Sequence, residues 1–164
     1  VAFGPDGAEL ARYAKMHPFS FAGEQEHYES GRGVATFPWA GWTVAPLICY
    51  DLRFPEAFRA AVRRGADLLV VLANWPRARE AHWTALLRAR AIENQAVVVG
   101  VNRRGRDPDN EYGGGSVIFG PRGEALAEAG DGETVLRARP DLPALREYRR
   151  RFPALRDIRA DYGT

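Results

Sequence analysis

Three long apolar segments separated by two helical patterns dominate the middle of this sequence. The segments are TVAPLIC (43–49), DLLVVLAN (67–74) and AVVVGVN (96–102). Continuous apolar runs of this length, rich in β-branched residues, are typical of strands that are covered on both faces. The alternation of strands and helices therefore predicts an α/β fold.

Two amphipathic helices are predicted between these strands. The first begins at Pro55, a residue that suits the first turn of a helix, and ends at Gly65. The second runs from about 81 to 94. Apolar residues recur at helical spacing in both: Phe54, Phe58, Ala61 and Val62 in the first, and Trp83, Leu86, Leu87 and Ala91 in the second. Each helix therefore has one face that can cover the sheet.

The flanking segments predict further strands, two loops and a last helix. Gly-Pro-Asp-Gly at 4–7 and Gly-Pro-Arg-Gly at 120–123 each separate two short strands, which indicates hairpins. Other strands are predicted at 34–37 and 133–139, irregular loops at 17–32 and 103–114, and a helix at 142–152. Because nothing marks an internal boundary, we expect residues 1–164 to belong to one domain.

Charge and hydropathy give little support for a nucleic-acid or membrane partner. The 23 Lys and Arg residues nearly balance the 21 Asp and Glu residues, for a net charge of +2. The run Arg-Arg-Gly-Arg at 103–106 and the basic tail lack the interleaved aromatic residues of a recognisable nucleic-acid motif, so a solvated face is preferred. No apolar run approaches the roughly 20 residues that span a bilayer. We expect neither partner.

The single cysteine and the first residue bear on the setting of the protein. One cysteine excludes a disulfide within the chain and fits a reducing compartment, which we take to be the cytoplasm. Position 1 is Val, the only methionine is Met16, and the first residues lack the pattern of a signal peptide. We therefore expect a truncated start.

Cys49 is the first candidate for chemistry because it ends a buried strand. Sites of open α/β sheets lie at the carboxyl ends of strands, a position that Asn74 shares. A following helix favours the thiolate through its N-terminal dipole, and the backbone N–H of Tyr50 is a candidate oxyanion donor. The alternative is that Cys49 is a small packing residue of the strand.

A cysteine nucleophile needs a base or a nearby cation, and several residues compete for this role. Each of the three histidines, His17, His27 and His82, is a candidate for a protease-like pair with the cysteine, but none is distinguished by its context. Lys15 is the only lysine, since the other permanently charged basic residues are all arginine. Its compact charge suits a place beside a reacting centre; a leftover surface lysine is the alternative.

Three runs of sequence carry a resemblance to a known family. They are YAKMHPFSFAGEQEHYESG (13–31), APLICYDLRFPEAF (45–58) and LANWPRAREAHWTALLRARAIENQ (72–95). In this order they resemble the nitrilase superfamily of carbon-nitrogen hydrolases, most closely its bacterial omega-amidase-like branch. The hairpin GSVIFGPRGE and the tail LREYRRRFPALRD are similar too. The resemblance covers nearly the whole chain, and it implies an αββα sandwich with two sheets.

The resemblance also implies a catalytic set of a glutamate base, a lysine and a cysteine, in which Lys15 and Cys49 match two members. Glu24 matches a second family glutamate that positions the substrate or the lysine; a solvated loop carboxylate is the alternative. By analogy, the thiolate adds to a small linear amide, Lys15 and the Tyr50 N–H hold the oxyanion, ammonia leaves, and water hydrolyses the thioester. This chemistry needs no metal or organic cofactor, and no metal-ligand spacing occurs in the chain.

Asn74, Trp75 and Arg53 are expected at the substrate pocket. For Asn74 and Trp75 the alternative is a Trp-Pro turn packed on the core. Arg53 suits a substrate carboxylate, with an internal pair to Glu56 as the alternative. Structural ion pairs or interface contacts are expected for three residues of the second helix, Arg88, Arg90 and Glu93. The resemblance further implies a homodimer or a higher homo-oligomer.

One part of the family pattern has no counterpart in this sequence. The general-base glutamate of the family precedes the hairpin with which this chain begins, so residues 1–164 alone are expected to form an incomplete sandwich with an exposed apolar edge and little or no activity. Three functions stay open. They are an amidase whose substrate is an amide, a nitrile or a carbamoyl compound; an inactive scaffold or dimerising binding module; and, with less support, a thiol redox protein without a second cysteine.

Overall fold

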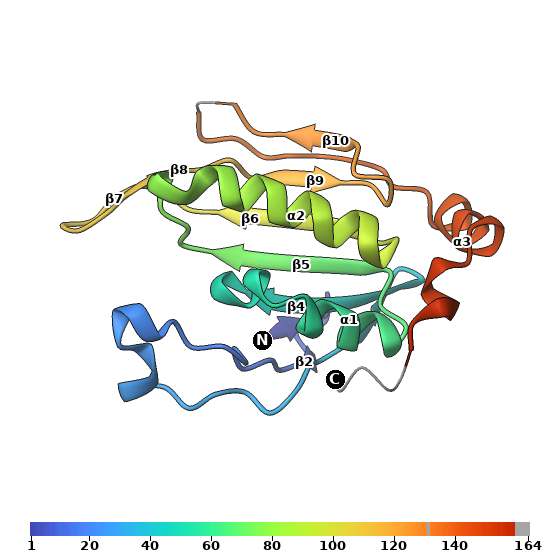
Figure 1. Cartoon of the computed structure of the whole chain (residues 1–164), viewed down its shortest axis with the longest axis horizontal. Coiled ribbons are helices and arrows are strands. Elements are labelled where there is room, and N and C mark those ends of the chain that lie inside the picture. The colour runs from blue at the N-terminus through green and yellow to red at the C-terminus, as the bar shows by residue number, and fades with distance from the viewer. Residues whose placement is uncertain (131, 160–164) are drawn as a thin grey trace.

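A six-stranded mixed sheet forms the body of the fold (Figure 1). The computed structural model describes residues 1–130 and 132–159. In the sheet order β10-β9-β6-β5-β4-β3, the strands are Ala125–Glu128, Val117–Phe119, Val97–Asn102, Leu68–Ala73, Trp42–Ile48 and Phe37–Trp39. The three predicted apolar strands, β4, β5 and β6, are parallel neighbours, and the outer strands join them antiparallel. The prediction of an α/β fold is confirmed.

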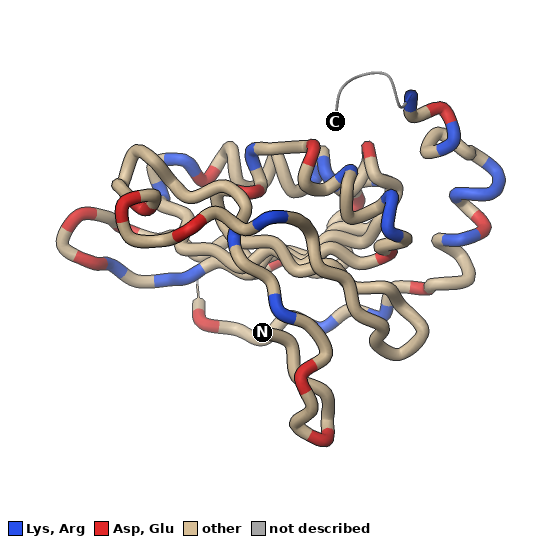
Figure 2. The backbone as a smooth tube through the Cα atoms, turned by 90° about the horizontal axis from the view of Figure 1, so that it is seen from below, with Lys and Arg blue, Asp and Glu red and all other residues tan. Residues whose placement is uncertain are grey.

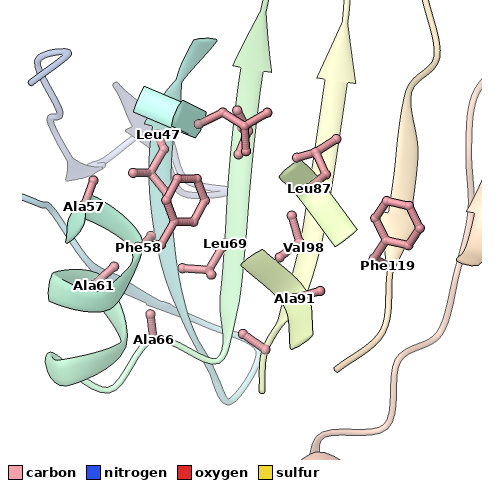
Figure 3. Close-up of a cluster of buried hydrophobic side chains, with 14 of the residues drawn as sticks. Leu47, Ala57, Phe58, Ala61, Ala66, Leu69, Leu87, Ala91, Val98 and Phe119 are labelled. Atoms are coloured by element: carbon pink, nitrogen blue, oxygen red, sulfur yellow. The ribbon is translucent and has the colours of Figure 1, made fainter. Parts of the chain in front are cut away.

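Two helices cover one face of this sheet (Figure 1). Helix α1 (Pro55–Arg63) connects β4 to β5, and α2 (Glu80–Asn94) connects β5 to β6. Their apolar faces meet strand residues in a core that Figure 3 shows in part, including the fully buried Leu47, Phe58, Leu69, Leu87, Val98 and Phe119. Burying one such side chain contributes about 1.5–3 kcal/mol. This cluster therefore holds both helices on the sheet.

Both helices stop where the sequence predicted, within two residues. Helix α1 has Pro55 in its first turn and ends ahead of Gly65, whose φ is +89°. Helix α2 ends at Asn94 because Gln95 adopts the left-handed conformation, with φ at +45°. A left-handed residue after the last turn ends many helices, since it turns the chain out of the helical path.

The opposite face of the sheet is only partly covered. Five buried side chains cluster there: Trp42, Val44, Leu68, Val97 and, from helix α3 (Leu142–Arg151), Leu145. Further along β5 and β6, on the same face, Leu72 and Val101 are 51% and 45% exposed. An exposed apolar edge was expected: Trp39 on the edge strand β3 and Leu126 on the edge strand β10 are exposed, and exposed apolar side chains also lie on the face of two central strands.

Both predicted hairpins are present, and the described residues form two more, one of which joins β3 to β4. Strands β1 (Ala2–Phe3) and β2 (Glu9–Ala11) pair antiparallel, as do β9 and β10. The other added hairpin, β7 (Arg104–Arg106) with β8 (Glu111–Gly113), lies inside the segment predicted as loop. Asp107 closes its turn, because its carboxylate accepts hydrogen bonds from two turn N–H groups and from the hydroxyl of Tyr112. Side-chain turns of this kind leave no periodic signal in the sequence.

Two further strand predictions are corrected. The strand predicted at 34–37 forms at Phe37–Trp39, where it can pair with β4 across a tight turn. No strand forms at 133–139, in which Val135 is 80% exposed. An alternating pattern makes a strand only where a neighbouring strand and a buried face are available.

Gly100 offers a direct test of the packing between α2 and the sheet. A Cβ at this position of β6 would clash with Leu87 Cδ1 and lie 2.9 Å from Trp83 Cζ2. We expect Gly100→Ala to lower the free energy of unfolding by about 1–3 kcal/mol, measured by urea denaturation. Gly33→Ala is the matched control, because nothing lies within 4 Å of its Cβ. Equal stabilities of the two variants would contradict the packing described.

Candidate active site

A pocket opens at the carboxyl ends of β4, β5 and β6. Its volume is ≈ 1240 Å³, and the N-terminal loop region lies beyond the same end of the sheet (Figure 1). It is lined by all seven residues that the sequence placed in the site: Lys15, Glu24, Cys49, Tyr50, Arg53, Asn74 and Trp75. Three separated segments meet here because parallel strands end at one edge of a sheet.

Cys49 lies in a strained turn directly after β4. It is the first residue of a short 3-10 helix, Cys49–Arg53, and its φ of +47° is in the left-handed region. Such a conformation is costly for a residue with a Cβ and is often kept at functional sites. The thiol is partly buried, with Sγ 4.0 Å from the carbonyl oxygen of Asn74. Tyr50, the second residue of the helix, has a backbone N–H without an acceptor inside it.

The protonation of the thiol differs from the sequence-based expectation. Burial raises the pKa of Cys49, and the positive charge of Lys15 lowers it only in part. The net pKa lies above the usual value, whereas the helix dipole had suggested a favoured thiolate. Desolvation disfavours the charged form more than this short helix and one ammonium can offset. The thiol therefore needs a base to remove its proton.

Lys15 and Glu24 form an ion pair at the pocket wall. The ammonium Nζ donates to Glu24 Oε2 at 2.5 Å, and the backbone N–H of Phe19 donates to the same oxygen at 2.9 Å. Burial raises the pKa of Glu24, but the hydrogen bonds from Lys15 and Phe19 and the Lys15 charge outweigh it, so the net pKa is lowered. Glu24 is thus a paired carboxylate and not a solvated one, and it holds the ammonium group of Lys15 in position.

The segment after β5 is held by an asparagine from β6. Asn102 Oδ1 accepts from the backbone N–H of Trp75 at 2.7 Å, and its amide nitrogen donates to the carbonyl oxygens of Trp75 and Gly114. The Trp75 ring is 3% exposed and donates to the Arg79 carbonyl oxygen at 2.7 Å. Trp75 therefore packs on the core and also lines the pocket, while its contact with a substrate stays a prediction.

Comparison with known proteins places this arrangement in a family. Residues 1–150 match the family model described as carbon-nitrogen hydrolase. The chain belongs to the carbon-nitrogen hydrolase family. It is 48% identical over 155 residues to omega-amidase YafV of Yersinia enterocolitica, which covers 93% of this chain and 59% of that protein. It is 42% identical to the 2-oxoglutaramate amidase of Bacillus subtilis, over 95% of this chain and 60% of that protein.

The fold agrees with this assignment. The carbon-nitrogen hydrolase superfamily protein XC1258 of Xanthomonas campestris superposes with a TM-score of 0.89 at 42% identity, over 95% of this chain and 61% of that one. The resemblance to the nitrilase superfamily and its omega-amidase-like branch is confirmed. Of the αββα sandwich, the described residues contain the six-stranded sheet with its helix layer, together with two small two-stranded sheets. The chain spans less than two thirds of the length of each of these three proteins.

In this member of the family, Arg53 contacts other partners than the sequence suggested. Its guanidinium lies 4.8 Å from the centre of the Trp75 ring, and Nη2 lies 3.4 Å from His82 Nδ1. The alternative pair with Glu56 is not formed among the described residues. Stacking on an aromatic ring leaves most donors of an arginine free. Arg53 therefore stays available at the pocket surface.

The charged residues of α2 mostly confirm a structural role. Arg90 forms an ion pair with Glu93 at 2.9 Å and donates to the carbonyl oxygen of Leu52, which ties α2 to the turn that carries the cysteine. Arg88 does not form an ion pair in the described structure; its guanidinium lies 5.1 Å from the centre of the Phe119 ring. The helix thus supports the site from behind.

Sequence reasoning missed several site residues. Asn102, Arg79 and Arg103 line the pocket, and Asp51 lies fully buried beneath it. Asn102 had a usable signal, since a polar amide that ends an apolar strand at a site edge resembles the position of Asn74. Asp51 had a weaker one, a carboxylate two residues after the candidate nucleophile.

The histidines of the site contact residues other than Cys49. His17 bonds to Asp51 and His82 lies near Arg53, and in the described part of the chain no histidine contacts the Cys49 thiol. Over residues 1–130 and 132–159, no three His, Cys, Asp or Glu side chains gather closely enough to hold a metal ion. None of the helices in these ranges is long and apolar enough to cross a membrane.

Proposed function

We propose that the protein is an amidase that hydrolyses a small linear amide to a carboxylate and ammonia through a thioester on Cys49. The observation that carries this proposal is the strained, partly buried thiol beside the Lys15–Glu24 pair in one pocket. Membership of the carbon-nitrogen hydrolase family supports the reaction class, and relatives named omega-amidase and 2-oxoglutaramate amidase support the substrate class.

The reaction follows from the chemistry of these groups. A base takes the thiol proton, and the Cys49 sulfur forms a bond to the amide carbon while the carbonyl π electrons move to oxygen. The ammonium of Lys15 and the Tyr50 N–H stabilise this oxyanion. The C–N bond then breaks as the nitrogen takes up a proton, and ammonia leaves a thioester. Water adds to the thioester, the C–S bond breaks, and the carboxylate product leaves the free cysteine.

The proposed substrate is the monoamide of a 2-oxo dicarboxylic acid. Three arginines, Arg53, Arg79 and Arg103, line the pocket together with Lys15. Lys15 is paired with Glu24, and Arg103 Nη1 lies 3.6 Å from Asp107 Oδ2. Arg53 and Arg79 are therefore the two residues left to face a substrate carboxylate. Guanidinium groups bind carboxylates in a bidentate way, so a second negative group on the amide fits this wall.

Trapping the thioester tests the proposal in the full-length protein. Ammonia release is measured with a panel of neutral amides, acidic monoamides, nitriles and carbamoyl compounds, and quenched samples are digested for mass spectrometry. We expect ammonia from acidic monoamides and an acyl adduct on the peptide that contains Cys49. Residues 1–164 contain one cysteine, so an adduct on this peptide identifies Cys49 as the acylated residue. Ammonia release with an adduct elsewhere contradicts the mechanism, and no release from any compound favours the inactive scaffold.

A further inference from the structure

The carboxylate of Asp51 is the most heavily bonded side chain beneath the site. It has no exposed surface. One oxygen accepts from the hydroxyl of Tyr13 at 2.7 Å and from the backbone N–H of Ile48 at 3.0 Å. The other accepts from the backbone N–H of His17 at 3.0 Å and lies 2.9 Å from His17 Nδ1. A carboxylate only accepts, so Nδ1 carries the proton in this contact.

These partners stand next to both groups of the proposed chemistry. Tyr13 and His17 are two residues before and two residues after Lys15, while Ile48 immediately precedes Cys49. We propose that Asp51 is a positioning residue, which holds the Lys15 ammonium beside the Cys49 thiol by joining the lysine segment to the nucleophile turn. This inference rests on the proposed function of that same pair.

Other contacts support one rigid unit around Asp51. The His17 ring stacks on Phe54 with 3.8 Å between ring centres and an angle of 8° between their planes, which adds a second link between the two segments. The Tyr13 hydroxyl accepts from the backbone N–H of Met16 at 3.3 Å. Burial and the bond to Asp51 raise the pKa of Tyr13. The phenol is therefore a permanent donor to the carboxylate.

The charges that face the thiol allow two roles of Asp51 to be told apart by the direction in which the pKa of Cys49 shifts. Burial raises the pKa of Cys49 most. The charge of Lys15 lowers this pKa, and the carboxylates of Glu24 and Asp51 each raise it by less than Lys15 lowers it. If Asp51 acts only through its charge, its removal lowers the pKa of the thiol. If it holds Lys15 in place, its removal lets the ammonium move away, and the pKa of the thiol rises.

Alkylation of Cys49 measures this pKa without any substrate. The rate of reaction with iodoacetamide is followed against pH in the full-length protein and in Asp51→Asn, and kcat and KM are measured on the amide substrate. Asp67→Asn is the matched control, because Asp67 is also buried and is bonded to Arg149 of α3 at 2.8 Å. It directly precedes β5 and so lies at the end of the sheet away from the pocket. Figure 2 shows several Lys and Arg residues gathered near the C-terminal end of the described chain.

We expect Asp51→Asn to raise the pKa of the thiol and to lower kcat roughly 10- to 100-fold with KM nearly unchanged, while Asp67→Asn changes neither. An unchanged or lowered pKa in Asp51→Asn overturns the inference. An absence of ammonia release in the parent protein contradicts the proposed function instead, and the alkylation result still decides whether Asp51 positions the lysine.

A second variant covers the case in which Asp51→Asn does not fold. Tyr13→Phe removes one bond and keeps the carboxylate charge. We expect a smaller rise in the pKa of the thiol, and none when Lys15→Met is already present, because the effect passes through the lysine. A rise of equal size in the Lys15→Met background, or no rise in either, overturns the proposal.

Discussion

Replacing Cys49 with alanine is expected to abolish ammonia release in the full-length protein, with kcat lowered by about 10⁴-fold or more. The thioester cannot form without the sulfur. Alanine keeps the Cβ and removes only Sγ, so the strained turn with φ at +47° is retained. A coupled assay for ammonia on an acidic monoamide measures the effect.

Cys49→Ser separates nucleophile chemistry from packing. Serine keeps the shape of the side chain, but its hydroxyl is far harder to deprotonate than a thiol, so at most a trace of turnover is expected. Unchanged circular dichroism and thermal unfolding in both variants exclude loss of the fold as the cause. Retained turnover in Cys49→Ala would refute the proposed mechanism outright.

Changing Lys15 to arginine is expected to lower kcat by about 10²–10³-fold although the charge is kept. The ammonium is a compact donor held 2.5 Å from Glu24 Oε2, with 15% of its side chain exposed. A planar guanidinium needs more room and directs its donors differently, so it cannot place a hydrogen at the same point near an oxyanion. Steady-state kinetics on the amide substrate, with the alkylation pH profile of Cys49 alongside, measures both consequences.

Two comparisons make the Lys15 prediction specific. Lys15→Met should lower kcat at least as much as Lys15→Arg and should raise the pKa of the thiol, because the lysine charge opposes the effect of burial there. Arg12→Ala is the matched control on the same segment, since Arg12 is exposed and pairs only locally with Glu9; we expect its rate to stay within about twofold. A near-normal rate for Lys15→Arg would place the lysine away from the oxyanion.

The middle of the fold was predictable because its signals are local. The apolar run at 67–74 and the helical spacing of Phe58, Ala61 and Val62 follow from side-chain periodicity alone, and the structure places them as expected. The strand predicted at 133–139 was wrong for the converse reason. Its alternation resembles a strand, but no neighbour covers Val135. Periodicity describes what a segment can bury, and it does not say whether a partner is present.

The pocket residues were predictable from strand order and family motifs, but their electrostatics were not. The sequence suggested a favoured thiolate at Cys49, whereas burial raises the pKa of that thiol. It suggested Glu56 as a partner of Arg53, which instead stacks on Trp75. Both outcomes depend on how deeply a group is buried and on what lies beside it in space. Neither quantity is a property of neighbouring residues in the chain.

The order of apolar strands and helices, the position of Cys49 at a strand end and the single Lys15 were all present in the chain before any folding was considered. The network beneath them was not, because Asp51 meets Tyr13 and His17 from 38 and 34 positions away. Contacts over such separations form only when the sheet brings two loops to one edge. Local periodicity thus determined the scaffold and the family resemblance named the candidate reacting groups, while long-range packing decided their burial, their charge balance and which buried carboxylate joins them.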